Sequence, residues 1–135
     1  ADEGIALGAA LLTPTRLYVR PVLDALKGGG VHALAHITGG GLTENLPRVL
    51  PEGLGAEIDL GTWSLPPVFG WIRATGGIGE AEMLKTFNSG IGMVVVVAEE
   101  AADRVASALA GAGETVHRIG HVRPGQGVRY SGTLA

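Results

Sequence analysis

Apolar residues along the chain follow two spacings, one typical of strands and one typical of helices. Apolar and β-branched runs predict strands at residues 31–38, 55–60 and 90–98. The last run holds four consecutive valines, which is typical of a strand buried on both faces. Helical spacing appears between these runs, so the pattern predicts an α/β or α+β domain with a mixed sheet flanked by helices.

The predicted helices have recognisable ends. Val19, Val22, Leu23 and Leu26 share one helical face, with Pro21 in the first turn and glycines 28–30 after the last. A second helix over residues 66–75 starts at two prolines and places Val68, Trp71 and Ile72 on one face; a short helix over residues 80–88 follows. A further helix over residues 99–113 has acidic residues in its first turn and Ala102, Val105, Ala106 and Leu109 on its apolar face.

The two ends of the chain differ in their patterns. Residues 114–134 predict two strands joined at residues 124–127, which we interpret as a terminal hairpin. Residues 1–15 contain no strand or helix signal of their own, which suggests that the chain is cut from a longer protein.

Composition narrows the functional classes. With 135 residues, 46% hydrophobic and 17% charged, the chain predicts one packed domain rather than a disordered segment. Ten basic and thirteen acidic residues give a net charge of −3 without a basic cluster, which argues against nucleic acid as a partner. The longest apolar run is far shorter than a membrane span, and the absence of cysteine fits a cytoplasmic protein.

The most informative stretch is the triple glycine at residues 39–41, which lies between a predicted strand and a predicted short helix. Bare backbone at such a place can direct several N–H groups at an anion, and the helix dipole would assist. Thr38, Asn45 and Arg48 lie close enough in sequence to assist, while Thr43 or Asn45 can cap a helix that ends before Pro51. A tight turn without any ligand is an equally good interpretation of this stretch alone.

Two other stretches are weaker candidates. Residues 88–92 precede the valine-rich strand, where Gly90 and Gly92 mark the close approach of a ligand or merely of a neighbouring helix. Thr13, Thr15 and Arg16 could line a cleft or belong to a simple capped loop. His32 and His36 share a strand face and could form a metal pair, but we expect a packed or surface role and assign no metal ligand to this chain.

The segments LLTPTRLYVRPVLDAL, HALAHITGGGLTENLPRVLP and GGIGEAEMLKTFNSGIGMVVVV, in this order, resemble the C-terminal half of aminoimidazole ribonucleotide synthetase. This enzyme is the phosphoribosylformylglycinamidine cyclo-ligase of purine biosynthesis. The resemblance covers nearly all 135 residues and implies the C-terminal half of a two-domain fold. Related ATP-dependent synthetases, kinases and a hydrogenase maturation factor share this domain with looser motifs.

The resemblance implies an ATP-dependent ring closure with Mg²⁺. ATP phosphorylates the formyl amide oxygen of formylglycinamidine ribonucleotide, and a substrate nitrogen then attacks the activated carbon and releases phosphate. By motif match, Gly39, Gly40 and Gly41 would contact a phosphate of the substrate or nucleotide. The neighbours of this phosphate would be His36, Thr38, Asn45 and Arg48, with Asn88 and Gly90 in a second cleft motif; no catalytic acid or base is assigned.

The sequence also departs from that family. The N-terminal domain that carries the ATP and Mg²⁺ motifs is not in this chain, nor is the S-G-x-H-S-N-G segment that usually opens the C-terminal half. We therefore expect a partial domain, a homodimer in the full-length protein, and no turnover by the isolated chain. Two alternatives stay open: a non-catalytic module that binds a phosphorylated ligand, and a related enzyme acting on another substrate.

Overall fold

The computed structural model describes residues 5–135 and contains both helices and strands. In chain order the elements are α1 (Leu7–Leu11), α2 (Val19–Leu26), β1 (Val31–His36), α3 (Gly41–Asn45), η1 (Pro47–Val49), β2 (Leu54–Asp59), η2 (Leu60–Thr62), α4 (Pro67–Gly76), α5 (Glu80–Thr86), β3 (Met93–Val97), η3 (Glu99–Ala101), α6 (Ala102–Gly111), β4 (Gly120–Pro124) and β5 (Gly127–Ser131). The predicted class, a mixed α and β domain, is confirmed.

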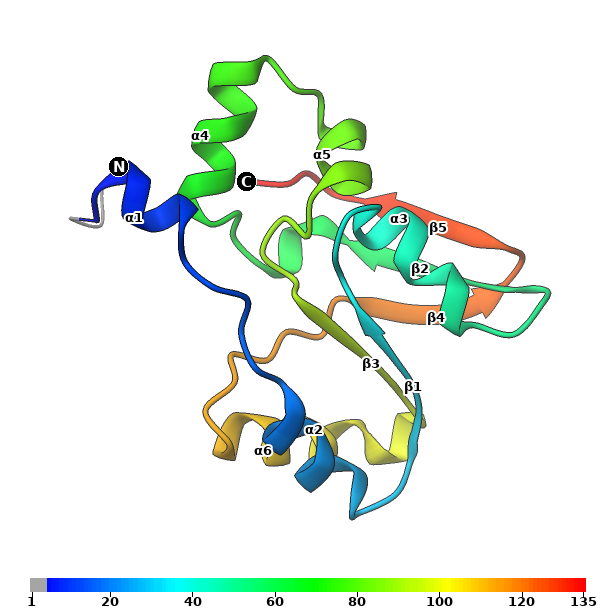
Figure 1. Cartoon of the computed structure of the whole chain (residues 1–135). Helices are drawn as coiled ribbons and strands as arrows, with labels where there is room; N and C mark the ends of the chain where they lie inside the picture. The colour runs from blue at the N-terminus through cyan, green and yellow to red at the C-terminus, as the bar shows by residue number, and fades with distance from the viewer. Residues whose placement is uncertain (1–4) are drawn as a thin grey trace.

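The strands form two small sheets (Figure 1). In the first, β1 pairs with β3 in antiparallel orientation. In the second, β2 lies between β4 and β5; it is antiparallel to β4 and parallel to β5, so this sheet is mixed. The valine-rich strand has the predicted two-sided burial, because Val94 and Val96 pack into one hydrophobic cluster and Val95 and Val97 into the other.

The predicted terminal hairpin is wrong. β4 and β5 are joined by a short turn as expected, but β2 lies between them and takes the hydrogen bonds that a hairpin would have made. The turn crosses over Gly55, where an added Cβ would lie 2.3 Å from the carbonyl oxygens of both Gly125 and Gly127. The Gly125 N–H also donates to the Gly53 carbonyl at 2.8 Å. This glycine-rich crossing lets the two strands pass on either side of β2.

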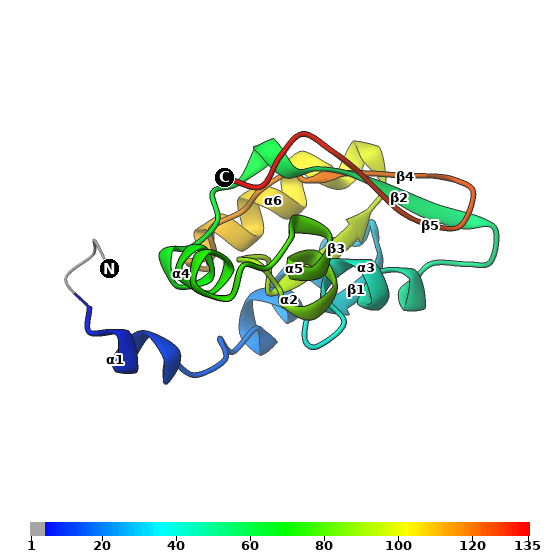
Figure 2. The same ribbon diagram turned by 90° about the horizontal axis from the view of Figure 1, so that it is seen from above.

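Helices cover the β1–β3 sheet on two sides. α2 and α6 pack together with β3 in a small cluster centred on Ala25, Val105 and Leu109. α3 and α5 pack together in the larger cluster, which also holds residues of both sheets. Figure 1 shows these two helix pairs well separated from each other, whereas they overlap in the view from above in Figure 2.

The predicted helix faces have different outcomes. On α6, Val105 and Leu109 are buried as expected. On α2 the prediction is wrong, because Val19, Leu23 and Leu26 are exposed and the buried residues are Pro21 and Ala25. On α4 no residue is buried, and Trp71 is exposed.

The N-terminal part contains a helix that the sequence pattern missed. α1 is a single short helix without a buried residue, and it lies beside α4 (Figure 1). The chain from α1 to α2 is extended, and Tyr18 is the first residue along it that is half-buried after Ala10. Residues 1–4 lie outside the described part of the chain.

Candidate functional site

A cleft of about 510 Å³ brings together three segments that are far apart in the sequence. It is lined by residues 13–16 and 18, residues 36–39, and residues 86–88, 90 and 92, together with Phe69. Each of the three stretches that the sequence singled out therefore contributes to one cleft. Of the predicted site residues, His36, Thr38, Gly39, Asn88 and Gly90 line it, whereas Gly40, Gly41, Asn45 and Arg48 do not.

The three consecutive glycines have three different environments. Gly41 is buried with φ 56°, and an added Cβ would lie 2.0 Å from the carbonyl oxygen of Leu84 on α5. Gly40 has φ 101°, a left-handed conformation that disfavours any side chain. Gly39 is exposed, is absent from the residues with positive φ, and has nothing within 4 Å of an added Cβ. Close packing explains the glycine at 41 and backbone conformation the one at 40, but neither explains the one at 39.

The backbone donors of this loop are partly available. The Gly41 N–H donates to the Thr38 carbonyl at 2.9 Å and is therefore already used. Within residues 5–135, the N–H groups of Gly39 and Gly40 donate to no protein acceptor. Because Gly39 also lines the cleft, its N–H is the loop donor best placed for a ligand.

The predicted capping of the next helix is wrong. α3 begins at Gly41, before Thr43 and Asn45, and Gly40 occupies the cap position. Asn45 is the last residue of α3, and its buried side-chain amide donates to the carbonyls of Thr38, Gly39 and Gly41 at 3.0–3.2 Å. Since α3 has only five residues, its dipole adds little to anion binding. Asn45 instead stabilises the glycine loop by binding three of its carbonyl groups.

Arg48 lies away from the cleft. Its Nη1 donates to the Asn45 side-chain oxygen at 3.2 Å, and its Nη2 lies 4.0 Å from the Glu44 carboxylate. The side chain is 65% exposed, so it can support Asn45 but does not reach the Gly39 side of the loop in this arrangement.

The second motif forms a tight turn. The Asn88 side chain accepts a hydrogen bond from the Gly90 N–H at 3.0 Å, and Gly90 has φ 102°. An added Cβ at Gly90 would lie 2.7 Å from Pro66, so packing explains this glycine. Ser89 between them has φ 51° and is fully buried, and its carbonyl accepts from the Trp63 ring N–H at 3.0 Å.

The N-terminal segment supplies residues that the sequence interpretation missed. Tyr18 lines the cleft, and its ring meets the His36 ring edge-on at 6.0 Å. Burial raises the pKa of Tyr18 above its ordinary value, the Glu114 carboxylate adds to this effect, and Arg16 opposes it. The only sequence signal for Tyr18 as a cleft residue is its position two residues after the T-P-T-R stretch.

Three cleft residues outside the N-terminal segment were also missed: Phe69, Thr86 and Phe87.

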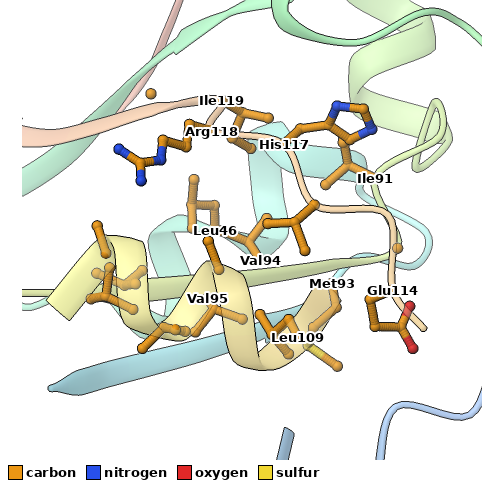
Figure 3. Close-up of a pocket in the computed structure, with 18 of the residues that line it drawn as sticks. Leu46, Ile91, Met93, Val94, Val95, Leu109, Glu114, His117, Arg118 and Ile119 are labelled. Carbon is orange, nitrogen blue, oxygen red and sulfur yellow. The ribbon is translucent and has the colours of Figure 1, made fainter. Parts of the chain in front are cut away.

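A second, larger cavity of about 940 Å³ lies between β3, α6 and the segment leading into β4 (Figure 3). Figure 3 shows aliphatic side chains such as Leu46, Val94 and Ile119 around it. Of the predicted site residues only Gly90 lines this cavity, so it is not the phosphate site that the motifs predict.

Residues 5–135 contain no group of three or more His, Asp or Glu side chains arranged to hold a metal ion. No helix within the same residues is long and apolar enough to cross a bilayer.

Comparison with known proteins agrees with this architecture. The family described as AIR synthase related protein, C-terminal domain, matches residues 1–132. The crystal structure of E. coli HypE, a hydrogenase maturation protein, is similar with a TM-score of 0.68 and 25% identity, covering 87% of this chain and 37% of HypE. A second crystal structure of E. coli HypE gives a TM-score of 0.68 and 27% identity, covering 90% and 38%. The chain thus spans less than two-fifths of the length of these proteins.

Proposed function

Because the chain belongs to the family of AIR synthase related C-terminal domains, we propose that its cleft binds a phosphate group during an ATP-dependent reaction. The reaction we favour is the closure of formylglycinamidine ribonucleotide to aminoimidazole ribonucleotide. In this proposal the chain supplies one half of the active site. An N-terminal domain supplies the ATP and Mg²⁺ sites, and the full-length protein is a homodimer.

The observation that carries the proposal is the convergence of three motifs on one cleft. Residues 13–16, 36–39 and 86–90 are the same stretches that resemble the cyclo-ligase. Gly39 adds a second argument, since neither its φ nor its neighbours require glycine. An oxyanion that contacts the main chain at this point would require it, because a Cβ would hold the anion away.

The residues of this chain have a binding and orienting part in the reaction. The Gly39 N–H would donate to a phosphate oxygen, and the Thr38 hydroxyl and the Asn88 amide are polar groups of the same cleft. ATP supplies the phosphoryl group that turns the formyl oxygen into a good leaving group. Residues 5–135 contain no group of three or more His, Asp or Glu side chains arranged for a metal ion, and in this proposal the ligands of Mg²⁺ belong to the N-terminal domain.

A second candidate is a maturation function like that of HypE. The similarity to two HypE crystal structures over at least 87% of the chain favours it. Both candidates use the same fold, and they differ in the compound that occupies the cleft. Phosphate release from ATP by the full-length protein distinguishes them: the cyclo-ligase requires formylglycinamidine ribonucleotide, whereas the second candidate predicts no response to this compound.

Calorimetric titration of the 135-residue chain with ribose 5-phosphate tests the binding site directly. We expect saturable binding that Gly39→Ala weakens about 10–100-fold. Alanine keeps the N–H, but its Cβ would hold the phosphate away, and losing a hydrogen bond to a charged group usually has an effect of this size. Gly79→Ala is the matched control, because Gly79 is exposed, has φ −69°, has nothing within 4 Å of an added Cβ and does not line the cleft. Equal affinities of wild type and Gly39→Ala would disprove the assigned site.

A further inference from the structure

Residues 13–18 form one side of the cleft, yet the main chain does little to hold them there. Within residues 5–135, no backbone hydrogen bond joins residues 14–18 to β1 or β3. The nearest ones run within the helical turns at either end, such as the Thr13 N–H to the Ala10 carbonyl at 3.4 Å. The position of this segment therefore depends on side chains.

Arg16 makes the first such contact. Its Nε lies 2.6 Å from the Glu114 carboxylate, and its Nη2 donates to the Gly113 carbonyl at 2.7 Å. The Glu114 side chain is only 13% exposed, so the pair is partly shielded from water. These contacts tie the segment to the turn that follows α6, nearly a hundred residues further along the chain.

Tyr18 makes the second contact. Its hydroxyl lies 1.9 Å from the point that a Cβ on Gly92 would occupy, and its ring contacts the His36 ring. The absence of a side chain at Gly92 therefore provides the space in which Tyr18 lies. Arg16, Tyr18, Gly90 and Gly92 line both the cleft and the larger apolar cavity, so Tyr18 stands at the boundary between the two.

We propose that Arg16 and Tyr18 are positioning residues, which hold residues 13–18 across from Gly39 through Glu114 and Gly92. This inference rests on the proposed function, because it makes the segment a part of the phosphate-binding cleft. Thr13 and Thr15 line the cleft and are presented to the ligand only while the two contacts persist. Neither Arg16 nor Tyr18 needs to touch the reacting atoms for this role.

Limited trypsin digestion of the 135-residue chain reports on the segment. Trypsin cuts after Arg16 only when the guanidinium is released from Glu114, although the next residue, Leu17, is 84% exposed. Cleavage after Lys27, the residue that follows α2, serves as the internal reference. We expect Glu114→Gln and Gly92→Ala to raise the ratio of cleavage at Arg16 to cleavage at Lys27 about fivefold, as the loss of a partly shielded contact implies.

Binding of ribose 5-phosphate is measured on the same variants. We expect each to weaken binding about fivefold while the melting temperature stays near that of wild type. Asp103→Asn is the matched control, since it removes the exposed Asp103–Arg118 pair outside the cleft. The double variant Arg16→Glu with Glu114→Arg re-forms the ion pair with the charges exchanged. Its affinity should therefore be higher than that of Glu114→Gln and near that of wild type, a rescue that a general loss of packing would not allow.

Each outcome decides the question. Unchanged cleavage ratios in both variants overturn the positioning role, and so do raised ratios with unchanged affinity, because the segment would then lie outside the binding site. A wild-type chain that binds no ribose 5-phosphate refutes the proposed function itself, and the inference that rests on it falls as well.

Discussion

Substituting alanine at Gly41 should destabilise the domain strongly, while the same change at Gly39 should not. The methyl group at position 41 would lie 2.0 Å from the Leu84 carbonyl oxygen and 2.8 Å from that of Phe87. Both are backbone atoms, so α3 and α5 must move apart, at about 1–3 kcal/mol for an overfilled contact. The left-handed φ of 56° adds about 1 kcal/mol for a residue with a Cβ.

The sum is about 2–4 kcal/mol, a large part of the stability of a domain this size. For 135 residues it corresponds to a fall in melting temperature of roughly 10 °C. At Gly39 the methyl group meets nothing within 4 Å, so the change should stay within about 0.5 kcal/mol. Thermal and urea unfolding of both variants, followed by circular dichroism, provides the assay. If Gly41→Ala were as stable as Gly39→Ala, the division of the loop into a packing glycine and a ligand glycine would be refuted.

Three further predictions concern the role of Asn45 in the glycine loop, the stability of the fold at alkaline pH, and turnover by the isolated chain. Asn45→Ala should cost about 1–3 kcal/mol in urea unfolding, because three loop carbonyls lose their buried donor; a loss below about 0.5 kcal/mol would contradict the role given to Asn45. Burial raises the pKa of Tyr130 above 10.0, although its hydroxyl contact with Thr43 opposes the shift. The partly buried, neutral Tyr130 therefore contributes its full stabilisation below about pH 10. This contribution is lost as the pH rises through the raised pKa that Tyr130 has in the folded state. Above about pH 10 the free energy of unfolding should fall less steeply with pH in Tyr130→Phe than in wild type, by up to about 1.4 kcal/mol per pH unit. Equal slopes in the two proteins would contradict the burial effect assigned to Tyr130. The 135-residue chain alone should neither hydrolyse ATP nor cyclise formylglycinamidine ribonucleotide, and measurable turnover by the purified chain would refute this.

Local signals in the sequence predicted most individual elements. The valine run of β3 and the glycines after α2 are determined by residues that are neighbours in the chain, so their patterns were sufficient. The pairing of β4 and β5 was not predictable in this way. It depends on β2, more than sixty residues earlier, and on the space above Gly55.

The candidate site shows the same division. The motifs predict that residues 36–39 and the pair Asn88 and Gly90 belong to one cleft, and all of them line it. The different roles of the three glycines could not be predicted from the sequence. Gly41 must lack a side chain because the Leu84 carbonyl of α5, more than forty residues further along the chain, lies against it. The motif and the short distance in sequence place Arg48 near the phosphate, but its side chain lies beside Glu44 instead.

The exposed apolar side of α2 is a further case. Val19, Leu23 and Leu26 have helical spacing, which normally predicts a buried face, yet all three are exposed. The face that packs against α6 is the one with Ala25, where a small residue allows the helices to approach closely. Periodicity gives the helix but not the choice between its two apolar sides.

The central claim is that the Gly39 N–H binds a phosphate oxygen in the cleft. The most direct test is nuclear magnetic resonance of the ¹⁵N-labelled chain during titration with ribose 5-phosphate. We predict that the Gly39 amide proton moves downfield in a saturable way, with a smaller change at Gly40 and none at Gly41, whose N–H already donates to Thr38. A Gly39 resonance that does not move while the compound binds elsewhere, or does not bind at all, would contradict the account.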